Sequence, residues 1–295
     1  MVKQISGILA LLATPFTEDY KINEDALRRE IDWVIGKGAD GIIVTGSVGE
    51  FVHLTDEERM KVFKICIDQI SGGKLAVAST SAAYTLQTIE ITKQAENLGY
   101  DGAMVVPPYY WRCSEEEVYR HYEMIAEHTD IPLILYHNPD LSKFYMRPEF
   151  VLKLTKIPQV VAIKEVVTDV QHLQKLMALI GDKINVLQYT TGFLTALMLG
   201  AEGGTIDPFF ITPAIKCKEA LENGHLMEAV EIQQKMMSVY PSISGEAATG
   251  ALGWFKAGVS IATGIDMGPP RPPYLPLTGE EYLQLEKRLK MILSE

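Results

Sequence analysis

Short apolar segments rich in Val, Ile and Leu alternate with longer segments in which apolar residues recur every three or four positions. The short segments are continuously apolar, which is typical of strands buried on both faces of a parallel sheet. The pattern predicts eight strands, at residues 7–12, 41–45, 75–79, 103–106, 133–136, 160–164, 184–187 and 204–206.

Capping residues precede several of the longer segments. Asn23 is placed to cap a helix that runs to Lys37 and stops at Gly38. The segments Thr55-Asp56-Glu57-Glu58 and Ser114-Glu115-Glu116-Glu117 have the spacing of capping boxes. Further helices are predicted at residues 84–98, 148–155, 170–180, 193–199 and 214–222.

Three joins between a helix and the next strand share one pattern: Gly38-Ala39-Asp40-Gly41, Gly99-Tyr100-Asp101-Gly102 and Gly200-Ala201-Glu202-Gly203. The first glycine can end a helix in the left-handed conformation, and the last permits a tight approach to the strand. Eight such βα units predict an α/β chain folded as a (β/α)8 TIM barrel. A doubly wound sheet is the alternative, but its glycine-rich loop is replaced by Ala13-Thr14-Pro15-Phe16.

Strand-like segments stop near Gly224. Helices are predicted beyond it at residues 225–240, 247–262 and 278–295, with a proline-rich connector at 269–273. We therefore predict a catalytic barrel at residues 1–224 and a C-terminal helical extension at residues 225–295, packed on the barrel.

Composition narrows the class of protein. The formal net charge of −11 disfavours binding to nucleic acid or to an anionic membrane surface. Three widely spaced cysteines predict neither a disulfide framework nor a zinc site, and each lies in or beside an apolar helical pattern typical of a buried thiol. No segment reaches the roughly 20 apolar residues that span a bilayer, and the apolar segment 8–13 is too short for a signal peptide. We expect a cytoplasmic protein.

Two strand ends carry candidate chemistry, because the functional side chains of a TIM barrel gather at the carboxyl ends of its strands. Lys164 ends an apolar strand. If it points inward, the loss of solvation favours the neutral amine, which can attack a ketone and form an imine. Alternatively it turns to solvent or pairs with a carboxylate such as Glu165. Tyr136 ends the neighbouring strand, where its phenol could relay protons or simply pack at the rim.

Two loops add polar groups. Ser47 lies in Gly46-Ser47-Val48-Gly49, where backbone N–H groups could hold a carboxylate, although such a loop is more often only a turn. Tyr109 and Tyr110 follow the fourth strand, where an aromatic pair serves an interface as readily as catalysis. The histidines are scattered, His137 is expected to pack at the rim, and no ligand cluster predicts a catalytic metal.

Four motifs resemble, in order, those of the dihydrodipicolinate synthase/N-acetylneuraminate lyase family: Gly46-Ser47-Val48-Gly49-Glu50, Pro108-Tyr109-Tyr110, Tyr136 with Pro139, and Ile163-Lys164-Glu165. The interval of 28 residues from Tyr136 to Lys164 also matches, and the resemblance runs from about Gly7 into the helical tail. It implies a class I pyruvate-dependent aldolase that forms a covalent imine on Lys164 and needs no cofactor or metal.

The resemblance also implies roles for single residues. Lys164 matches the Schiff-base lysine, and Tyr136 matches the tyrosine that moves protons at the imine. Ser47 would link that tyrosine to Tyr110, which in many relatives reaches into a neighbouring subunit's site. Backbone N–H groups of Ser47 and Val48 would bind the keto-acid carboxylate. Most relatives are homotetramers built as dimers of dimers, so a homo-oligomer is implied.

The acceptor side departs from the family's pattern. Ile206 matches a position whose carbonyl lies near the site, but Leu141 stands where synthases carry an arginine for the acceptor's carboxylate. Tyr189-Thr190-Thr191-Gly192 replaces the sugar-binding signature of the lyase branch. Tyr136-His137-Asn138-Pro139 and Gly268-Pro269-Pro270-Arg271-Pro272-Pro273-Tyr274 are similar to hydratase-aldolases that cleave benzylidenepyruvates.

The sequence therefore predicts a carbon–carbon lyase whose small-molecule partners are a 2-keto acid such as pyruvate and a weakly charged or apolar aldehyde. One alternative is 4-hydroxy-tetrahydrodipicolinate (dihydrodipicolinate) synthase, which condenses pyruvate with aspartate semialdehyde. A metal-dependent class II aldolase on the same barrel is another. The alternative of a different class is a non-catalytic barrel that binds a keto acid as a sensor.

Overall fold

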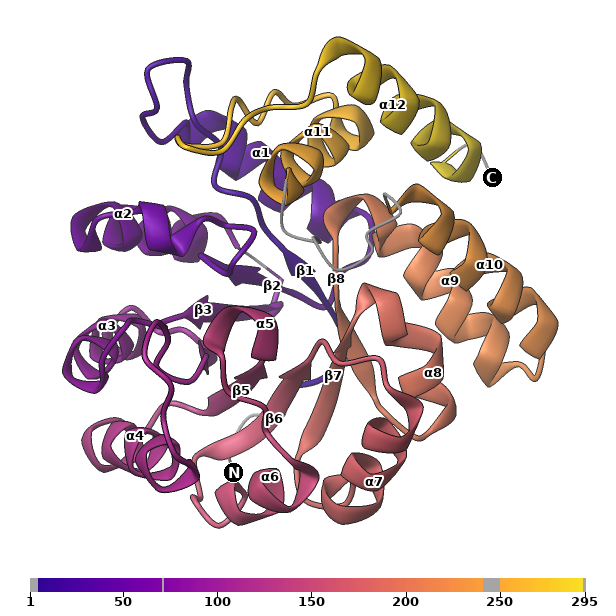
Figure 1. The fold of residues 1–295 in the computed structure, drawn as a ribbon. Helices are drawn as coiled ribbons and strands as arrows, with labels where there is room; N and C mark the ends of the chain where they lie inside the picture. The colour runs from indigo at the N-terminus through magenta and orange to yellow at the C-terminus, as the bar shows by residue number, and fades with distance from the viewer. Residues whose placement is uncertain (1–4, 71, 241–249, 294–295) are drawn as a thin grey trace. The chain divides into compact units, whose positions relative to one another are not determined.

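The computed structural model describes residues 5–70, 72–240 and 250–293. Its strands close into a barrel in the order β1 to β8 (Figure 1), with parallel pairing from β3 through β8. The strands are β1 (Ile8–Leu11), β2 (Gly41–Val44), β3 (Leu75–Ser79), β4 (Gly102–Val105), β5 (Leu133–His137), β6 (Val160–Glu165), β7 (Asn185–Tyr189) and β8 (Gly203–Ile206). The predicted (β/α)8 TIM barrel is confirmed.

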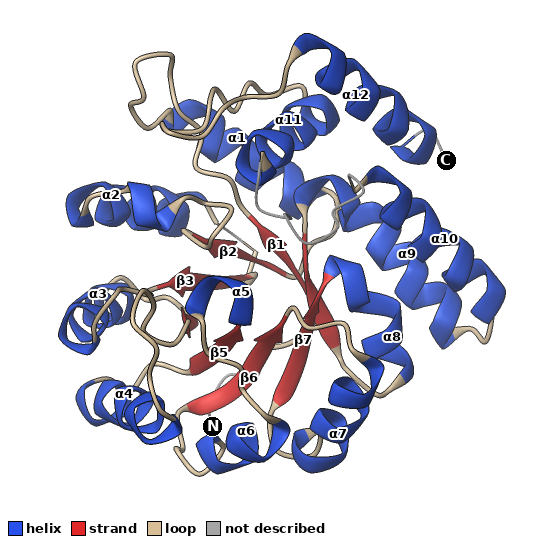
Figure 2. Ribbon diagram, in the orientation of Figure 1, coloured by secondary structure: helices blue, strands red, loops and turns tan. Residues whose placement is uncertain are grey.

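Helical segments follow every strand in the chain (Figure 2). The α-helices are α1 (Glu24–Gly36), α2 (Asp56–Gln69), α3 (Thr85–Asn97), α4 (Glu115–His128), α5 (Pro139–Ser142), α6 (Pro148–Leu154), α7 (Val170–Ile180), α8 (Phe193–Met198), α9 (Ile211–Glu222), α10 (Leu226–Val239), α11 (Ala251–Thr263) and α12 (Gly279–Leu293). Three short 3-10 helices are η1 (Phe51–His53), η2 (Thr190–Gly192) and η3 (Pro208–Phe210).

The helix starts read from the sequence are confirmed. The Asn23 side chain accepts a hydrogen bond from the Ala26 backbone N–H at the start of α1. Thr55 and Ser114 both form complete capping boxes, so two backbone N–H groups at each helix start are satisfied. These local signals fix where the helices that follow β1, β2 and β4 begin.

The glycines at the joins also behave as predicted. Gly38 and Gly99 have φ angles of +97° and +85°, in the left-handed region that favours glycine. At the other end of the first join, a Cβ on Gly41 would lie 2.4 Å from the Leu75 carbonyl oxygen, so only glycine allows the strands to approach this closely. These glycines therefore lie, as predicted, where a helix ends and where the next strand begins.

Strands β5, β6 and β7 extend past their predicted ends, to His137, Glu165 and Tyr189. The additional residues are polar, and the ladder pairs His137 with Glu165 directly beyond the Tyr136–Lys164 pair. The apolar pattern could not predict polar strand ends, which are stabilised by side-chain contacts described below. Helix α5 and the three 3-10 helices were not predicted either, because they are too short for a periodic pattern.

The chain divides into two compact units, each with its own buried apolar core. The first comprises Met1–Leu9, Asp40–Ile43 and Gly73–Thr205, and in it α3 packs on α4, α4 on α6, and α6 on α7. The second comprises Ala10–Ala39, Val44–Gly72 and Ile206–Glu295, and in it α1 packs on α2, α9 on α10, and α11 on α12. The domain boundary at residues 224/225 stays a prediction.

The three predicted C-terminal helices are confirmed as α10, α11 and α12, although residues 247–249 of the second prediction and 294–295 of the third lie outside the described residues. All three cysteines are free. Cys66 and Cys217 are buried as expected, but Cys113 is partly exposed, which corrects its prediction as a buried thiol. Cys113 lies before the start of α4 and not within it. The same segment carries the exposed aromatic side chains of Tyr110 and Trp111.

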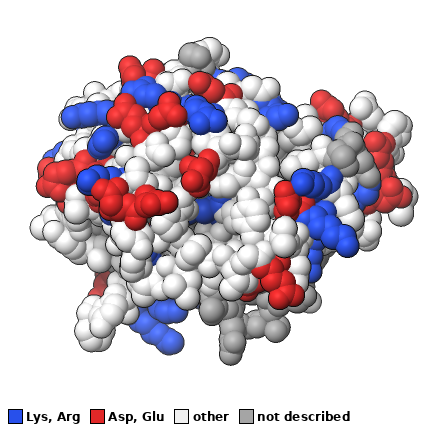
Figure 3. Space-filling model, turned by 90° about the horizontal axis from the view of Figure 1, so that it is seen from above, with Lys and Arg blue, Asp and Glu red and all other residues white. Residues whose placement is uncertain are grey.

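Within the described part of the chain, no helix is long and apolar enough to cross a membrane. On the face shown in Figure 3, acidic and basic side chains are interleaved, so the net charge of −11 is not gathered there in one patch.

Candidate active site

Lys164 lies on β6 with its side chain buried, 3% exposed. Its Cα partner on β5 is Tyr136, which is 4% exposed. The Lys164 Nζ atom lies 4.2 Å from the centroid of the Tyr136 ring and 6.0 Å from that of the Tyr189 ring on β7. Paired residues of neighbouring strands point to the same face, so the structure brings the predicted amine and phenol together inside the barrel.

No carboxylate of the described residues forms an ion pair with Lys164. The predicted alternative, a pair with Glu165, is wrong, because successive residues of a strand point to opposite faces. The Glu165 carboxylate instead lies 2.8 Å from His137 Nδ1 and 3.0 Å from His172 Nε2. Lys164 is thus a buried amine that faces two phenol rings, an environment in which an unpaired charge is costly.

The phenol of Tyr136 accepts a hydrogen bond from the side-chain amide of Asn138, at 3.0 Å. Asn138 also caps α5, because its Oδ1 accepts from the Leu141 backbone N–H at 3.3 Å. The Leu141 side chain is 49% exposed and carries no charge to the segment that follows β5. One asparagine therefore links the phenol to the backbone position of Leu141.

Three predicted site residues belong to the second unit. Ser47 and Val48 are partly exposed in the turn after β2, where the Ser47 carbonyl accepts from the Glu50 N–H at 3.1 Å. Thr14 Oγ1 donates to the Gly49 carbonyl at 2.6 Å and ties this turn to the segment after β1. Ile206 is completely buried as the last residue of β8. Their predicted roles toward a keto acid stay predictions.

Tyr110 lies on the surface of the first unit, 82% exposed. Its φ angle is +80°, and its ring makes an edge-to-face contact with Trp111, centroid to centroid 5.6 Å. The structure does not bring Tyr110 to Lys164 within this single chain. The predicted contribution of Tyr110 to a neighbouring subunit's site therefore stays a prediction.

A buried polar cluster on the outer face of β5 and β6 was not predicted from the sequence. His137 and Glu165 end β5 and β6 and are completely buried, and His172 on α7 is 6% exposed. Burial alone would raise the pKa of Glu165, but hydrogen bonds from His137 and His172 hold it below its ordinary value. The register could have revealed the first two residues, since each follows a paired site residue.

This cluster also corrects the expectation that the chain holds no group of possible metal ligands. One ligand atom each of His137, Glu165 and His172 lies within 4.8 Å of the others. However, His137 Nε2 already accepts from the Met146 N–H at 3.0 Å, and His172 Nδ1 lies 2.7 Å from the Tyr145 hydroxyl. Both imidazoles therefore use both nitrogen atoms within the protein, which fits a hydrogen-bond network better than a metal site.

A second buried cluster surrounds Glu50, at the end of the Gly46–Gly49 turn. Lys256 Nζ on α11 lies 3.0 Å from Glu50 Oε1 and 3.0 Å from the Pro269 carbonyl. Burial lowers the pKa of Lys256 to about 8, although Glu50 opposes this change. Burial also raises the pKa of Glu30, on α1, to about 8. These charges serve contacts within the second unit, and none of them was predicted.

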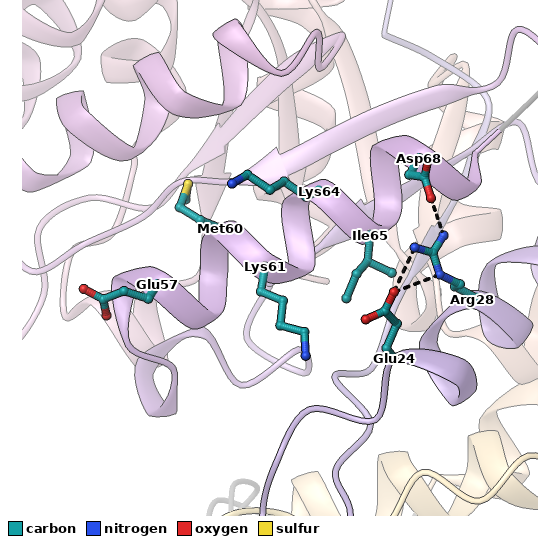
Figure 4. Close-up of a pocket in the computed structure, with 8 residues that line it drawn as sticks. All are labelled: Glu24, Arg28, Glu57, Met60, Lys61, Lys64, Ile65 and Asp68. Atoms are coloured by element: carbon teal, nitrogen blue, oxygen red, sulfur yellow. Dashed lines mark hydrogen bonds and ion pairs between the residues drawn. The ribbon is translucent and has the colours of Figure 1, made fainter.

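A surface pocket lies between α1 and α2, and none of the predicted site residues lines it (Figure 4). Three of its charged side chains pair with one another: Arg28 forms ion pairs with Glu24 and Asp68, at 2.9 and 2.7 Å. Its lining residues are Glu24, Arg28, Glu57, Met60, Lys61, Lys64, Ile65 and Asp68. The pocket therefore carries side chains of both charges, some of them paired within it.

The chain is similar to known proteins over nearly its whole length. The model of the Dihydrodipicolinate synthetase family matches residues 4–292. An uncharacterized DapA-like lyase from Pyrobaculum islandicum is 33% identical, over 97% of this chain and 98% of its own. A 4-hydroxy-tetrahydrodipicolinate synthase from Oceanobacillus iheyensis is 30% identical, over 96% of this chain and 95% of its own.

A solved structure agrees with these matches. YagE, a prophage protein of the dihydrodipicolinic acid synthase family from Escherichia coli K12, was crystallised in complex with pyruvate. It is 26% identical to this chain and superposes with a TM-score of 0.90. The match covers 97% of this chain and 98% of the YagE chain. A buried lysine and a buried tyrosine are paired inside a TIM barrel, and the family model matches nearly the whole chain. The chain therefore belongs to the dihydrodipicolinate synthetase family and is a carbon–carbon lyase of the class I aldolase type.

Proposed function

We propose that this enzyme joins or splits a 2-keto acid and an aldehyde through a Schiff base on Lys164, with pyruvate as the keto acid. The observation that carries the proposal is the buried Lys164 amine, 4.2 Å from the centre of the Tyr136 ring and without a carboxylate partner among the described residues. An amine that no ion pair holds is available as the nucleophile that imine formation requires.

The chemistry follows from these two groups. The neutral amine of Lys164 attacks C2 of the keto acid and forms a carbinolamine. Tyr136 donates a proton to the C2 hydroxyl, which leaves as water, and the resulting tyrosinate takes a C3 proton from the iminium, which becomes an enamine. In one direction C3 attacks the aldehyde carbon and forms the C3–C4 bond; in the other that bond breaks. Hydrolysis of the imine returns the free lysine.

Further predicted residues complete the proposal. Ser47 and Tyr110 extend the proton relay, the latter from a second copy of the chain in a homo-oligomer. The backbone N–H groups of Ser47 and Val48 bind the keto-acid carboxylate, and the Ile206 carbonyl lies beside the site. A covalent imine on Lys164 serves in place of a cofactor, and the enzyme works in the cytoplasm.

The acceptor aldehyde is weakly charged or apolar. Leu141 places an uncharged side chain on the segment after β5, where the family's synthases carry an arginine. Tyr189 supports the same assignment, because its ring lies 6.0 Å from Lys164 Nζ and offers an aromatic surface to a group bonded at C4.

The test is reductive trapping. The enzyme is incubated with pyruvate and borohydride, and the adduct is measured by intact mass and located by peptide mapping. We expect one reduced pyruvyl group per chain, on Lys164, and none on the Lys164→Ala variant. The matched control Lys153→Ala, on α6, should form the adduct fully. A wild-type enzyme without an adduct, or with the adduct on another lysine, would contradict the proposal.

One observation favours a second candidate, 4-hydroxy-tetrahydrodipicolinate synthase: a relative with that name is 30% identical over nearly the whole chain. An assay with pyruvate and aspartate semialdehyde, compared with benzaldehyde at equal concentration, separates the candidates. Faster consumption of aspartate semialdehyde would favour the synthase. A trapped adduct without turnover of any aldehyde would favour a keto-acid sensor.

A further inference from the structure

Backbone groups and a carboxylate fix the orientation of the buried network behind Lys164. The Met146 backbone N–H can only donate, so His137 Nε2 accepts and His137 Nδ1 carries the proton that it donates to Glu165 Oε2. His172 Nε2 donates to the same oxygen, and the Tyr145 hydroxyl lies 2.7 Å from His172 Nδ1. Both ring nitrogens of both histidines therefore have a partner within the network.

The carboxylate is also held from its own strand. Glu165 Oε1 accepts a hydrogen bond from the Val167 backbone N–H at 2.8 Å, just after β6 ends. The low pKa of Glu165 agrees with this arrangement, because each of these bonds favours the anion. Glu165 thus joins the end of β6, the end of β5 and the first turn of α7 through three donors.

The network lies on the outer face of β5 and β6, and the Lys164–Tyr136 pair lies on their inner face. The ladder sets Tyr136 opposite Lys164 and His137 opposite Glu165, and alternate residues point to opposite faces. A shift of β6 relative to β5 that breaks the His137–Glu165 bond therefore also moves the amine away from the phenol. The same network holds Tyr145 and the Met146 N–H, which end the segment that carries α5 and Leu141.

We propose that Glu165, His137 and His172 are positioning residues that fix the distance between the Lys164 amine and the Tyr136 phenol. The inference rests on the proposed function, since only imine chemistry requires that distance. A misplacement of reacting groups by about 1 Å can cost on the order of 100-fold in rate. Loss of the carboxylate should therefore slow the chemical step, while the binding of the keto acid is retained.

The test uses pyruvate alone. An enamine on Lys164 exchanges the methyl protons of pyruvate for deuterium in D2O, which NMR follows as kcat and KM. Glu165→Gln keeps the size of the side chain, but an amide has a single acceptor oxygen. If that oxygen faces the two histidines, the NH2 group faces the Val167 N–H, which Glu165 Oε1 accepts in the wild type. We expect kcat for exchange to fall about 10- to 100-fold with KM within a factor of about two, and Glu165→Asp to recover part of the loss. Glu149→Gln, on the exposed face of α6, is the matched control and should exchange at the wild-type rate.

If Glu165 served only to stabilise the fold, its replacement would lower the number of competent sites and not the kcat of each site. The adduct trapped by borohydride at completion counts the competent sites, so a variant that merely unfolds in part loses sites but keeps its kcat per site. If Glu165→Gln fails to fold, Tyr145→Phe gives the second measurement, because its side chain is 46% exposed and only the hydroxyl is removed. We expect a fall of about 2- to 5-fold in kcat per site, as one bond of the network is lost.

The possible outcomes are distinct. A wild-type enzyme that neither traps nor exchanges pyruvate would refute the proposed function and this inference with it. A wild-type enzyme that exchanges pyruvate, beside Glu165→Gln and Tyr145→Phe variants with unchanged kcat per site, would refute the positioning role and leave the Schiff base intact.

Discussion

Two lysines are buried among the described residues, and they differ in whether a carboxylate pairs with the buried amine. Lys256 lies 3.0 Å from a Glu50 carboxylate oxygen and 3.0 Å from a backbone carbonyl, so its ammonium is compensated. Lys164 has two phenol rings around it and no carboxylate among the described residues. Lys164 is therefore the lysine whose amine is not held in an ion pair and can serve as a nucleophile.

A change at Tyr136 tests the role of the phenol. Tyr136→Phe keeps the ring that packs near Lys164 Nζ but removes the proton donor, so trapping of pyruvate should slow by about 100-fold or more. The final yield of adduct should stay the same, because the lysine is unchanged. Tyr119→Phe, on α4, is the control and should trap pyruvate at the wild-type rate. A Tyr136→Phe enzyme as fast as wild type would remove the phenol from the relay.

At the scale of residues, the Tyr136–Lys164 pair was predicted from the sequence, but the buried cluster around Glu165 was not. The interval between Tyr136 and Lys164 and the strand ends on which they lie were enough to place them together. Alternation along a strand would also have excluded Glu165 as the partner of Lys164. His172 could not be found in this way, because its approach to Glu165 depends on how α7 packs on β6, and helix periodicity does not encode that packing.

At the scale of elements, the connector after α11 is held by one arginine. The Arg271 backbone N–H donates to Glu50 Oε2 at 3.0 Å, and its guanidinium donates to the carbonyls of His53 and Tyr20 at 2.6 and 2.8 Å. Both guanidinium arms also reach the Glu58 carboxylate on α2. A planar fork with several donors can satisfy all these partners at once, whereas an ammonium cannot.

Arg271→Lys should therefore destabilise the enzyme, although the charge is kept. We expect the free energy of unfolding to fall by about 1–3 kcal/mol, since charge-assisted and neutral hydrogen bonds are lost together. Urea unfolding monitored by fluorescence measures the change. Arg120→Lys, on an exposed face of α4, is the comparison and should cost less than about 1 kcal/mol. Equal losses in the two variants would show that the connector does not depend on the guanidinium.

Elements themselves were largely predictable where they are long. Every strand and every α-helix of at least six residues was expected, because capping boxes, glycine joins and apolar periodicity agree with one another. The exceptions share a cause. Helix α5 has four residues and depends on the Asn138 cap, and the polar ends of β5 and β6 are stabilised by side chains from a neighbouring strand and helix.

For the whole molecule, two buried groups shape the dependence of stability on pH. The pKa of Glu30 is about 8 when folded and 4.5 as its ordinary value, so between these pH values the folded chain holds a proton that the unfolded chain has lost. Unfolding free energy must then fall as pH rises through this window. Lys256, with a pKa of about 8 against 10.5, acts in the opposite sense at higher pH.

Glu30→Gln should remove the first of these effects. The amide oxygen can still accept the Ala13 N–H that Glu30 Oε1 accepts at 3.1 Å, so the variant should match wild type near pH 5. By pH 8 it should be the more stable protein, by an amount on the order of a few kcal/mol. Urea unfolding at pH 5, 6, 7 and 8 gives both curves, with the exposed Glu219→Gln as the control. Parallel curves for wild type and Glu30→Gln would mean that Glu30 is ionised in the folded protein.

The closed barrel also bears on how the chain is made. Strand β1 finds one neighbour early, but its other side is completed by β8, where the Gly204 N–H donates to the Gly7 carbonyl at 3.0 Å. A ribosome must therefore release nearly 200 further residues, by sequence position, before the first strand loses its open edge. An apolar edge exposed for that long during synthesis invites pairing with other chains, so a chaperone that shields residues 8–11 should raise the yield of soluble enzyme.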